Sequence, residues 1–226
     1  MKRPTAHLSS RTATVARMHW CDLRRRRLAL FLLVAMPAAF YLSLPPEDPF
    51  APMGAVIGLA FTVAGAAFFV VLAGRRVDSR LVLAGYRPGQ LIGGRLLMLE
   101  VVAAALGLGF AILTLRSTPA RPGILVLASL ASALLAVPVG LAIAAVLPHE
   151  LEGMLLIIGL VGVGMSVPPS SAIAPYLPLY GPARLVRVAV FGGHPLPPLL
   201  HTAAWTTGLL LLAWLATIRR LPRTVG

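Results

Sequence analysis

Six apolar stretches alternate with short polar or proline-containing breaks along the chain. A helix needs about 20 mostly apolar residues to cross a bilayer, and each stretch approaches or exceeds that length. The predicted spans are residues 28–44, 51–73, 96–115, 124–147, 151–167 and 199–218. The pattern therefore predicts an all-α, polytopic membrane protein with six transmembrane helices, in which residues 1–226 form a single transmembrane domain.

The segment before the first span, residues 12–27, is predicted to form an amphipathic helix. Ala16, Trp20 and Leu23 fall on one face of such a helix, whereas Arg17 falls off it. A basic helix with one apolar face lies in the plane of the membrane interface. We therefore expect an N-terminal interfacial helix that leads into the first span.

Residues 168–198 are apolar but rich in proline. Each interior proline removes a backbone hydrogen bond, so a straight helix through this segment is excluded. Irregular backbone persists at membrane depth only where it is buried in protein or faces water. We predict a re-entrant or surface segment on the outer side, with a short helix at about Ala183 to Phe191.

Composition supports a membrane protein over a soluble one. The chain is 58% hydrophobic and 12% charged, whereas soluble domains carry about 25% charged residues. Twenty bases against seven acids give a net charge of +13, which in a soluble protein would suggest nucleic acid. Here the bases flank apolar runs, as the positive-inside rule describes. We therefore expect a membrane lipid environment and no nucleic-acid partner.

The distribution of bases predicts an orientation. With the N-terminus inside, sixteen bases fall on the cytoplasmic side and four on the outer side, a strong asymmetry. Both termini are therefore expected in the cytoplasm, in a multi-pass protein of the cell membrane. Residues 44–47 make a poor signal-peptidase site, so the first span is expected to remain as an anchor.

The long loop of residues 75–95 on the predicted cytoplasmic side has a helical pattern of its own. Asp78 and Ser79 are good N-caps, and Gly85 is a natural C-terminal stop. A short separate helix between them would present apolar residues and arginines to the cytosol. The alternative is a solvated basic loop that only sets topology, and the pattern alone favours neither.

Three acidic residues stand out. Glu100 lies about one turn into the third span, where an acid is costly. We favour pairing with Arg95 near the interface over a substrate or proton contact. Glu150 and Glu152 lie at the start of the fifth helix, where the helix dipole favours acids.

Several chemistries lack their motifs. The sequence has no G-x-x-x-x-G-K-[ST] loop, no H-E-x-x-H motif and no G-x-S-x-G elbow. His194 and His201 have no third metal ligand nearby. We expect no catalytic residue, cofactor or metal site in this chain, which makes a membrane-embedded enzyme the least favoured class.

The order of these parts resembles the membrane subunit, or permease, of a small six-helix ABC-2-type ABC transporter. The parts are an interfacial basic helix, a long loop between spans two and three, a short acidic junction before span five, a proline-rich outer segment and a basic tail. The stretch from Arg80 to Leu96 is similar to the family's segment in which charged residues, Gly and Pro precede a Gly-Arg pair entering span three.

The resemblance implies a mechanism and a set of contacts. Residues 76–90 would contain a coupling helix that docks on a separate ABC ATPase subunit, with a second contact at the acidic junction. The implied docking residues are Arg76, Asp78, Ser79, Arg80, Leu83, Tyr86, Arg87, Glu150 and Glu152. Residues 12–27 would be the connecting, or elbow, helix.

The resemblance also implies assembly and transport. Two permeases would form a homodimer or heterodimer, with spans one, two and five lining the path. The complex would export a hydrophobic or amphipathic substrate across the cell inner membrane, using ATP hydrolysed by the partner. The alternative is a non-transporting membrane protein, such as an assembly or immunity-type factor.

Overall fold

The computed structural model describes residues 6–45, 48–117, 120–147, 149–168 and 170–220, and these residues form helices joined by turns. The α-helices are α1 (Ala6–Arg25), α2 (Arg27–Leu42), α3 (Ala51–Leu83), α4 (Pro88–Thr114), α5 (Pro122–Val146), α6 (Glu150–Ser166), α7 (Tyr180–Phe191) and α8 (Leu196–Arg220). The 3-10 turns are η1 (Leu115–Ser117) and η2 (Ala174–Tyr176). The predicted all-α class is confirmed.

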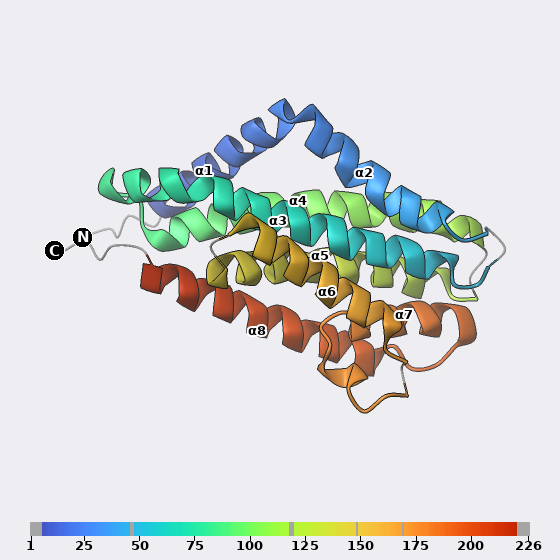
Figure 1. The fold of residues 1–226 in the computed structure, drawn as a ribbon. Coiled ribbons are helices and arrows are strands. Elements are labelled where there is room, and N and C mark those ends of the chain that lie inside the picture. The colour runs from blue at the N-terminus through green and yellow to red at the C-terminus, as the bar shows by residue number, and fades with distance from the viewer. Residues whose placement is uncertain (1–5, 46–47, 118–119, 148, 169, 221–226) are drawn as a thin grey trace.

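From α3 to α6, each long helix runs opposite in direction to the one before it, and the long helices form a bundle (Figure 1). The start of α1, the α3–α4 turn, the α5–α6 connection and the end of α8 lie at one end, called here the terminal end. The α2–α3, α4–α5 and α6–α8 connections lie at the opposite end. Segments far apart in the sequence are thus gathered at each end of the bundle.

Among the described residues, four helices are long and apolar enough to cross a membrane. They are Ala51–Arg75 within α3, Pro88–Thr114, Pro122–Val146 and Leu196–Arg219. The other two predicted spans correspond to α2, which has 16 residues, and α6, which has 17. At 1.5 Å per residue these helices are roughly 24 and 26 Å long. A hydrocarbon core is about 30 Å thick. The fold is therefore that of a multi-pass membrane protein with four spans by length and composition, and six crossings stay a prediction.

Small residues bring α3 against its neighbours. A Cβ atom added at Gly54 would overlap the carbonyl of Phe40, and one added at Gly58 would lie 2.6 Å from Cα of Pro37. The same test at Gly140 of α5 gives an overlap with a carbonyl of α3. Because glycine has no side chain, the helix backbones can approach closely at these positions, and such close packing drives helix association in lipid. Helix α3 therefore packs tightly on α2 through one face and on α5 through another.

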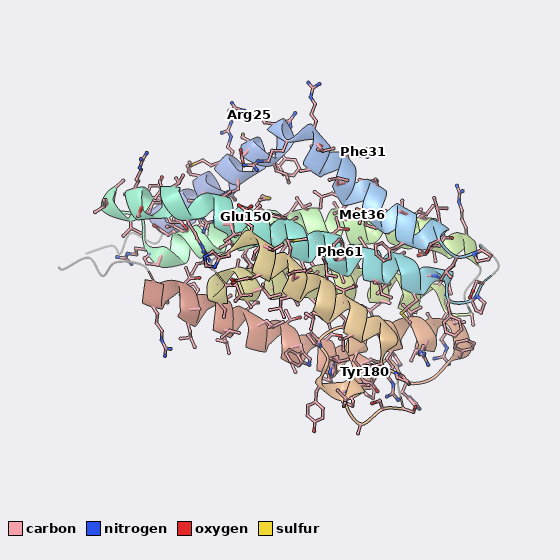
Figure 2. The ribbon with its side chains drawn as sticks, in the orientation of Figure 1. Arg25, Phe31, Met36, Phe61, Glu150 and Tyr180 are labelled. Atoms are coloured by element: carbon pink, nitrogen blue, oxygen red, sulfur yellow. The ribbon has the colours of Figure 1, made fainter. Side chains whose placement is uncertain are left out.

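Helix α1 begins at Ala6, earlier than the predicted residue 12. Val15 and Leu23 are buried against the bundle, and Val15 packs on Gly94 at the start of α4. Trp20, on the predicted apolar face, is 42% exposed. Helices α1 and α2 meet at an angle, and Arg25 and Phe31 point away from the bundle there (Figure 2). An interfacial position for α1 stays a prediction.

The proline-rich segment contains the predicted short helix. Helix α7 ends at Phe191 as expected and begins three residues earlier than Ala183, at Tyr180. Its buried residues pack on α5, and the chain then turns through Gly192 and Gly193, which have φ values of 87° and 128°. The re-entrant or surface position of this segment on the outer side stays a prediction.

Candidate functional site

Helix α3 continues past its apolar part to Leu83 without a break. The predicted separate short helix starting at Asp78 or Ser79 is therefore wrong. No glycine or proline interrupts residues 75–84, so nothing stops the helix until Gly85, whose φ of 86° confirms the predicted stop. Helix α4 begins at Pro88, a favoured first residue. The long loop is thus reduced to a tight corner between two helices.

A buried ion pair holds this corner together. Asp78 is 6% exposed and Arg95 is 4% exposed. One guanidinium nitrogen of Arg95 donates to Oδ2 of Asp78 at 2.8 Å, and the other donates to Oδ1. The guanidinium also lies against Gly74, where any side chain would collide with it. This bidentate geometry is the strong form of the Arg–carboxylate contact.

Asp78 was expected to dock a partner. In this structure it is buried and engaged by Arg95, and a contact with a partner stays a prediction. Glu100 was expected to pair with Arg95, and that pairing is wrong because Asp78 takes both ends of the guanidinium. Glu100 is half-buried on α4, and the described side chains offer it no hydrogen bond or ion pair.

His19 connects α1 to the same pair. Nε of Arg95 donates to Nε2 of His19 at 3.2 Å. Burial and the positive charge of Arg95 lower the pKa of His19 from 6.5 to about 4. The ring is therefore neutral at pH 7 and accepts at Nε2, which leaves its proton on Nδ1. His19, Asp78 and Arg95 form what we call the internal bridge, which joins α1, α3 and α4.

Arg75 links the corner to the α5–α6 connection. Its guanidinium donates to the carbonyl of Ala144 and, at 3.1 Å, to the carbonyl of Leu147. These carbonyls lie at the C-terminus of α5, where a cation is favoured by the helix dipole. The two predicted docking regions, one at the corner and one at the acidic junction, are thereby fixed relative to each other.

The outer side of the corner carries apolar and basic side chains. Leu83 is 82% exposed and Val77 is 45% exposed, and both Arg80 and Arg87 are exposed. We call Val77, Arg80, Leu83 and Arg87 the exposed corner. A leucine projecting into solvent from a braced helix end, between cations, is suited to an apolar pocket with an acidic rim.

The remaining predicted docking residues have different surroundings. Ser79 is exposed. Tyr86 is half-buried, and the guanidinium carbon of Arg11 lies 5.5 Å from its ring centre while Arg11 donates to the carbonyl of Gly85 at 2.8 Å. The side chain of Arg76 lies outside the part of the chain that the structure describes.

Glu150 and Glu152 lie in the first turn of α6, as predicted. Figure 2 shows Glu150 at the start of that helix. Both side chains are exposed, and Nδ1 of His149 lies 3.4 Å from Oε2 of Glu152. The favourable helix-dipole position is confirmed, whereas contact with a partner stays a prediction.

Sequence reasoning missed the supporting roles of His19 and Arg75 and assigned Arg95 to the wrong partner. Their partners lie 17 to 76 residues away in the chain, so no local pattern indicates these contacts. Within the described residues, no group of three His, Cys, Asp or Glu side chains could hold a metal ion.

Comparison with models of known protein families finds no match, and comparison with curated proteins finds none either. The fold and the apolar helices define a multi-pass, α-helical membrane protein.

Proposed function

We propose that this chain is the permease subunit of an ABC-2-type ABC transporter, which exports a hydrophobic or amphipathic substrate with ATP hydrolysed by a separate ATPase. One observation carries the proposal. The extension of α3 beyond its apolar part ends in an exposed, arginine-flanked Leu83, and the buried internal bridge holds that extension in place. A basic loop that only set topology would need no such support.

The bracing gives the proposed coupling a physical route. A force on Leu83 passes along one continuous helix into the centre of the bundle, because α3 is unbroken between Ala51 and Leu83. The Arg75 contacts carry the same displacement to the C-terminus of α5. Closure of an ATPase dimer would thus tilt α3 and α5 together.

The proposed topology has six crossings with both termini in the cytoplasm. The terminal end would then be cytoplasmic, with the exposed corner and the acidic junction facing the ATPase. Helices α2 and α6 would cross as the first and fifth spans, with α1 as the elbow helix. Their shortness is compatible with local thinning of the bilayer.

A second permease copy or a sister chain completes the proposed complex. Exposed apolar side chains on α6 include Leu151, Leu155 and Ile158, and a Cβ added at Gly159 would meet nothing within 4 Å. A partner permease would pack on this face, which in the proposed topology lines the path.

The test begins with the tagged full chain, purified from its native membranes into nanodiscs. ATP hydrolysis is measured, and co-purifying subunits are examined for a P-loop. We expect an ATPase to co-purify, and Leu83→Asp to reduce its recovery about tenfold or more, because an unpaired carboxylate buried in an apolar contact costs more than the roughly 1.4 kcal/mol that corresponds to tenfold. Leu83→Met keeps an apolar side chain and should retain the ATPase.

The matched control is Arg116→Glu, an exposed arginine at the opposite end of the bundle, which should leave recovery unchanged. If Leu83→Asp binds the ATPase as well as the native chain does, the docking surface is elsewhere. If the native chain recovers no ATPase, the non-transporting alternative replaces this proposal.

A further inference from the structure

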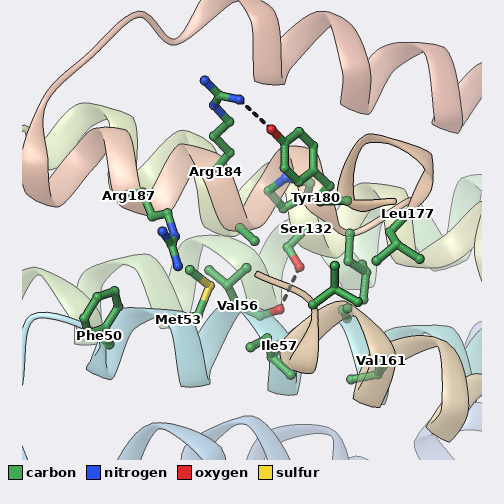
Figure 3. Close-up of a pocket in the computed structure, with 17 residues that line it drawn as sticks. Phe50, Met53, Val56, Ile57, Ser132, Val161, Leu177, Tyr180, Arg184 and Arg187 are labelled. Carbon is green, nitrogen blue, oxygen red and sulfur yellow. Dashed lines mark hydrogen bonds between the residues drawn. The ribbon is translucent and has the colours of Figure 1, made fainter. Parts of the chain in front are cut away.

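A cavity of about 220 Å³ lies among α3, α5, α6 and α7 (Figure 3). It is near the end of the bundle that holds the α2–α3 and α4–α5 connections, opposite the terminal end. Most of its lining is apolar and includes Val56, Ile57, Val161, Gly164 and Leu177. Ser132 contributes a hydroxyl, but that hydroxyl donates to the carbonyl of Val56 at 2.7 Å. The interior therefore presents apolar surface to an occupant.

Two arginines of α7 form one side of this cavity. Arg184 and Arg187 are three residues apart and so share a helix face. Arg184 donates to the hydroxyl of Tyr180, and the guanidinium carbon of Arg187 lies 5.9 Å from the ring centre of Phe50. These contacts orient both guanidinium groups without neutralising their charge.

The same two arginines line a second, wider hollow of about 650 Å³. Ser170 and His194 contribute polar groups to it. None of the described residues that line either hollow is Asp or Glu. Among the described lining residues, two cations without an acid thus stand between the narrower cavity and the wider hollow.

We propose that this pair of hollows binds an anionic amphiphile. The apolar cavity takes part of an alkyl chain, and Arg184 and Arg187 bind a phosphate or carboxylate headgroup whose remainder occupies the wider hollow beside Ser170 and His194. Substrate pockets that enclose a drug-sized ligand measure roughly 300–1,000 Å³, so the apolar cavity admits only a segment of such a chain. The rest would extend along the helices into lipid.

The charge and polarity of the two hollows favour an anionic amphiphile over a neutral hydrocarbon or a bare anion. A neutral hydrocarbon would take water from the two guanidinium groups without replacing its hydrogen bonds, which is costly. A bare anion would leave the apolar cavity unfilled. Guanidinium groups bind phosphate and carboxylate oxygens through paired hydrogen bonds. As the substrate class of the exporter, the amphiphile rests on the proposed function, but its binding requires no ATPase.

The binding test uses the purified full chain alone, in nanodiscs of neutral phosphatidylcholine. The probe is radiolabelled lysophosphatidic acid, which has one acyl chain and a phosphate. We expect saturable binding, and binding weaker by about a hundredfold or more in the double variant Arg184→Gln, Arg187→Gln, because each lost hydrogen bond to a charged group contributes about 1.5–3 kcal/mol. Arg116→Gln, at the same end of the bundle, is the matched control and should bind normally.

A second variant tests the apolar cavity separately. An added Cβ at Gly164 would lie 3.6 Å from Leu179, an ordinary contact. Because Gly164 lines the cavity, we expect the larger side chain of Gly164→Leu to extend into it. It should weaken binding of the lysophosphatidic acid while preserving the thermal midpoint of unfolding.

Competitors distinguish the source of affinity. Unlabelled lysophosphatidic acid should displace the probe, whereas inorganic phosphate and an uncharged monoacylglycerol should not at equal concentration. Displacement by phosphate alone would mean a free-anion site, and displacement by monoacylglycerol would mean an apolar pocket that ignores charge. Either result, or no saturable binding, overturns this proposal and leaves the ATPase-docking proposal untouched.

Discussion

The charges of Asp78 and Arg95 are buried, and each is stabilised there by its ion pair with the other. Removing one partner of a buried ion pair leaves the other charge uncompensated, at a cost of about 3–5 kcal/mol. We therefore expect Asp78→Asn to lower the thermal midpoint of unfolding in nanodiscs markedly. The double variant Asp78→Leu, Arg95→Met should recover most of the loss, because an apolar pair of similar volume often replaces a buried ion pair at no cost.

Asp22 offers the control at the same scale. Its ion pair with Arg26 spans one helical turn, and both side chains are more than half exposed. Such pairs contribute about 0–1 kcal/mol, so Asp22→Asn should leave the midpoint nearly unchanged. Equal midpoints for Asp78→Asn and Asp22→Asn would mean that the internal bridge does not stabilise the corner.

His19 makes the stability of the corner depend on pH. Its pKa is about 4 in the folded chain and 6.5 when unfolded, so the unfolded chain binds the proton first as pH falls. The stabilisation is complete above pH 6.5 and declines as pH falls towards 4. Arg95, Asp78 and Asp22 are the charges that act on the ring.

The prediction follows from that sign. Between pH 7.5 and 5, the thermal midpoint of the native chain should fall more than that of His19→Gln, whose amide oxygen can still accept from Arg95. Parallel curves for the two proteins would contradict it, because the carboxylates remain in both.

At the scale of elements, the apolar runs predicted the helices because burial in lipid requires long, continuous apolar helices with all backbone groups paired. The sequence did not predict that the polar residues after the second apolar run would continue the same helix. Residues 75–83 extend α3 because no glycine or proline intervenes, and the good N-cap at Asp78 is overridden by its ion pair with Arg95. Such a pair, 17 residues apart, has no local signature.

Packing between elements had a signature that was overlooked. Gly54 and Gly58 have the spacing of a helix-packing motif, and the structure places α2 on them. Some parts of the candidate sites could likewise be predicted from the sequence, and others could not. Leu83, Arg80 and Arg87 were predictable as exposed because they flank a turn, whereas the cavity beside Arg184 depends on four helices coming together and leaves no pattern in any one of them.

At the scale of the whole molecule, the orientation and the two short helices decide how many times the chain crosses the membrane. Labelling of cysteines with a membrane-impermeant maleimide in intact cells tests each short helix with one pair of positions. For α2, native Cys21 should be protected, and Ser43→Cys in a Cys21→Ser chain should be labelled. For α6, His149→Cys should be protected and Ser170→Cys labelled, again without Cys21.

These pairs are informative because each short helix is the only segment between its two positions. If both members of a pair react alike, that helix does not cross, and every later connection changes sides. Permeabilised cells should label all four positions, which shows that protection comes from the membrane. Opposite labelling within both pairs would place the exposed corner and the acidic junction together in the cytoplasm, where an ATPase can reach them, and Arg184 and Arg187 outside.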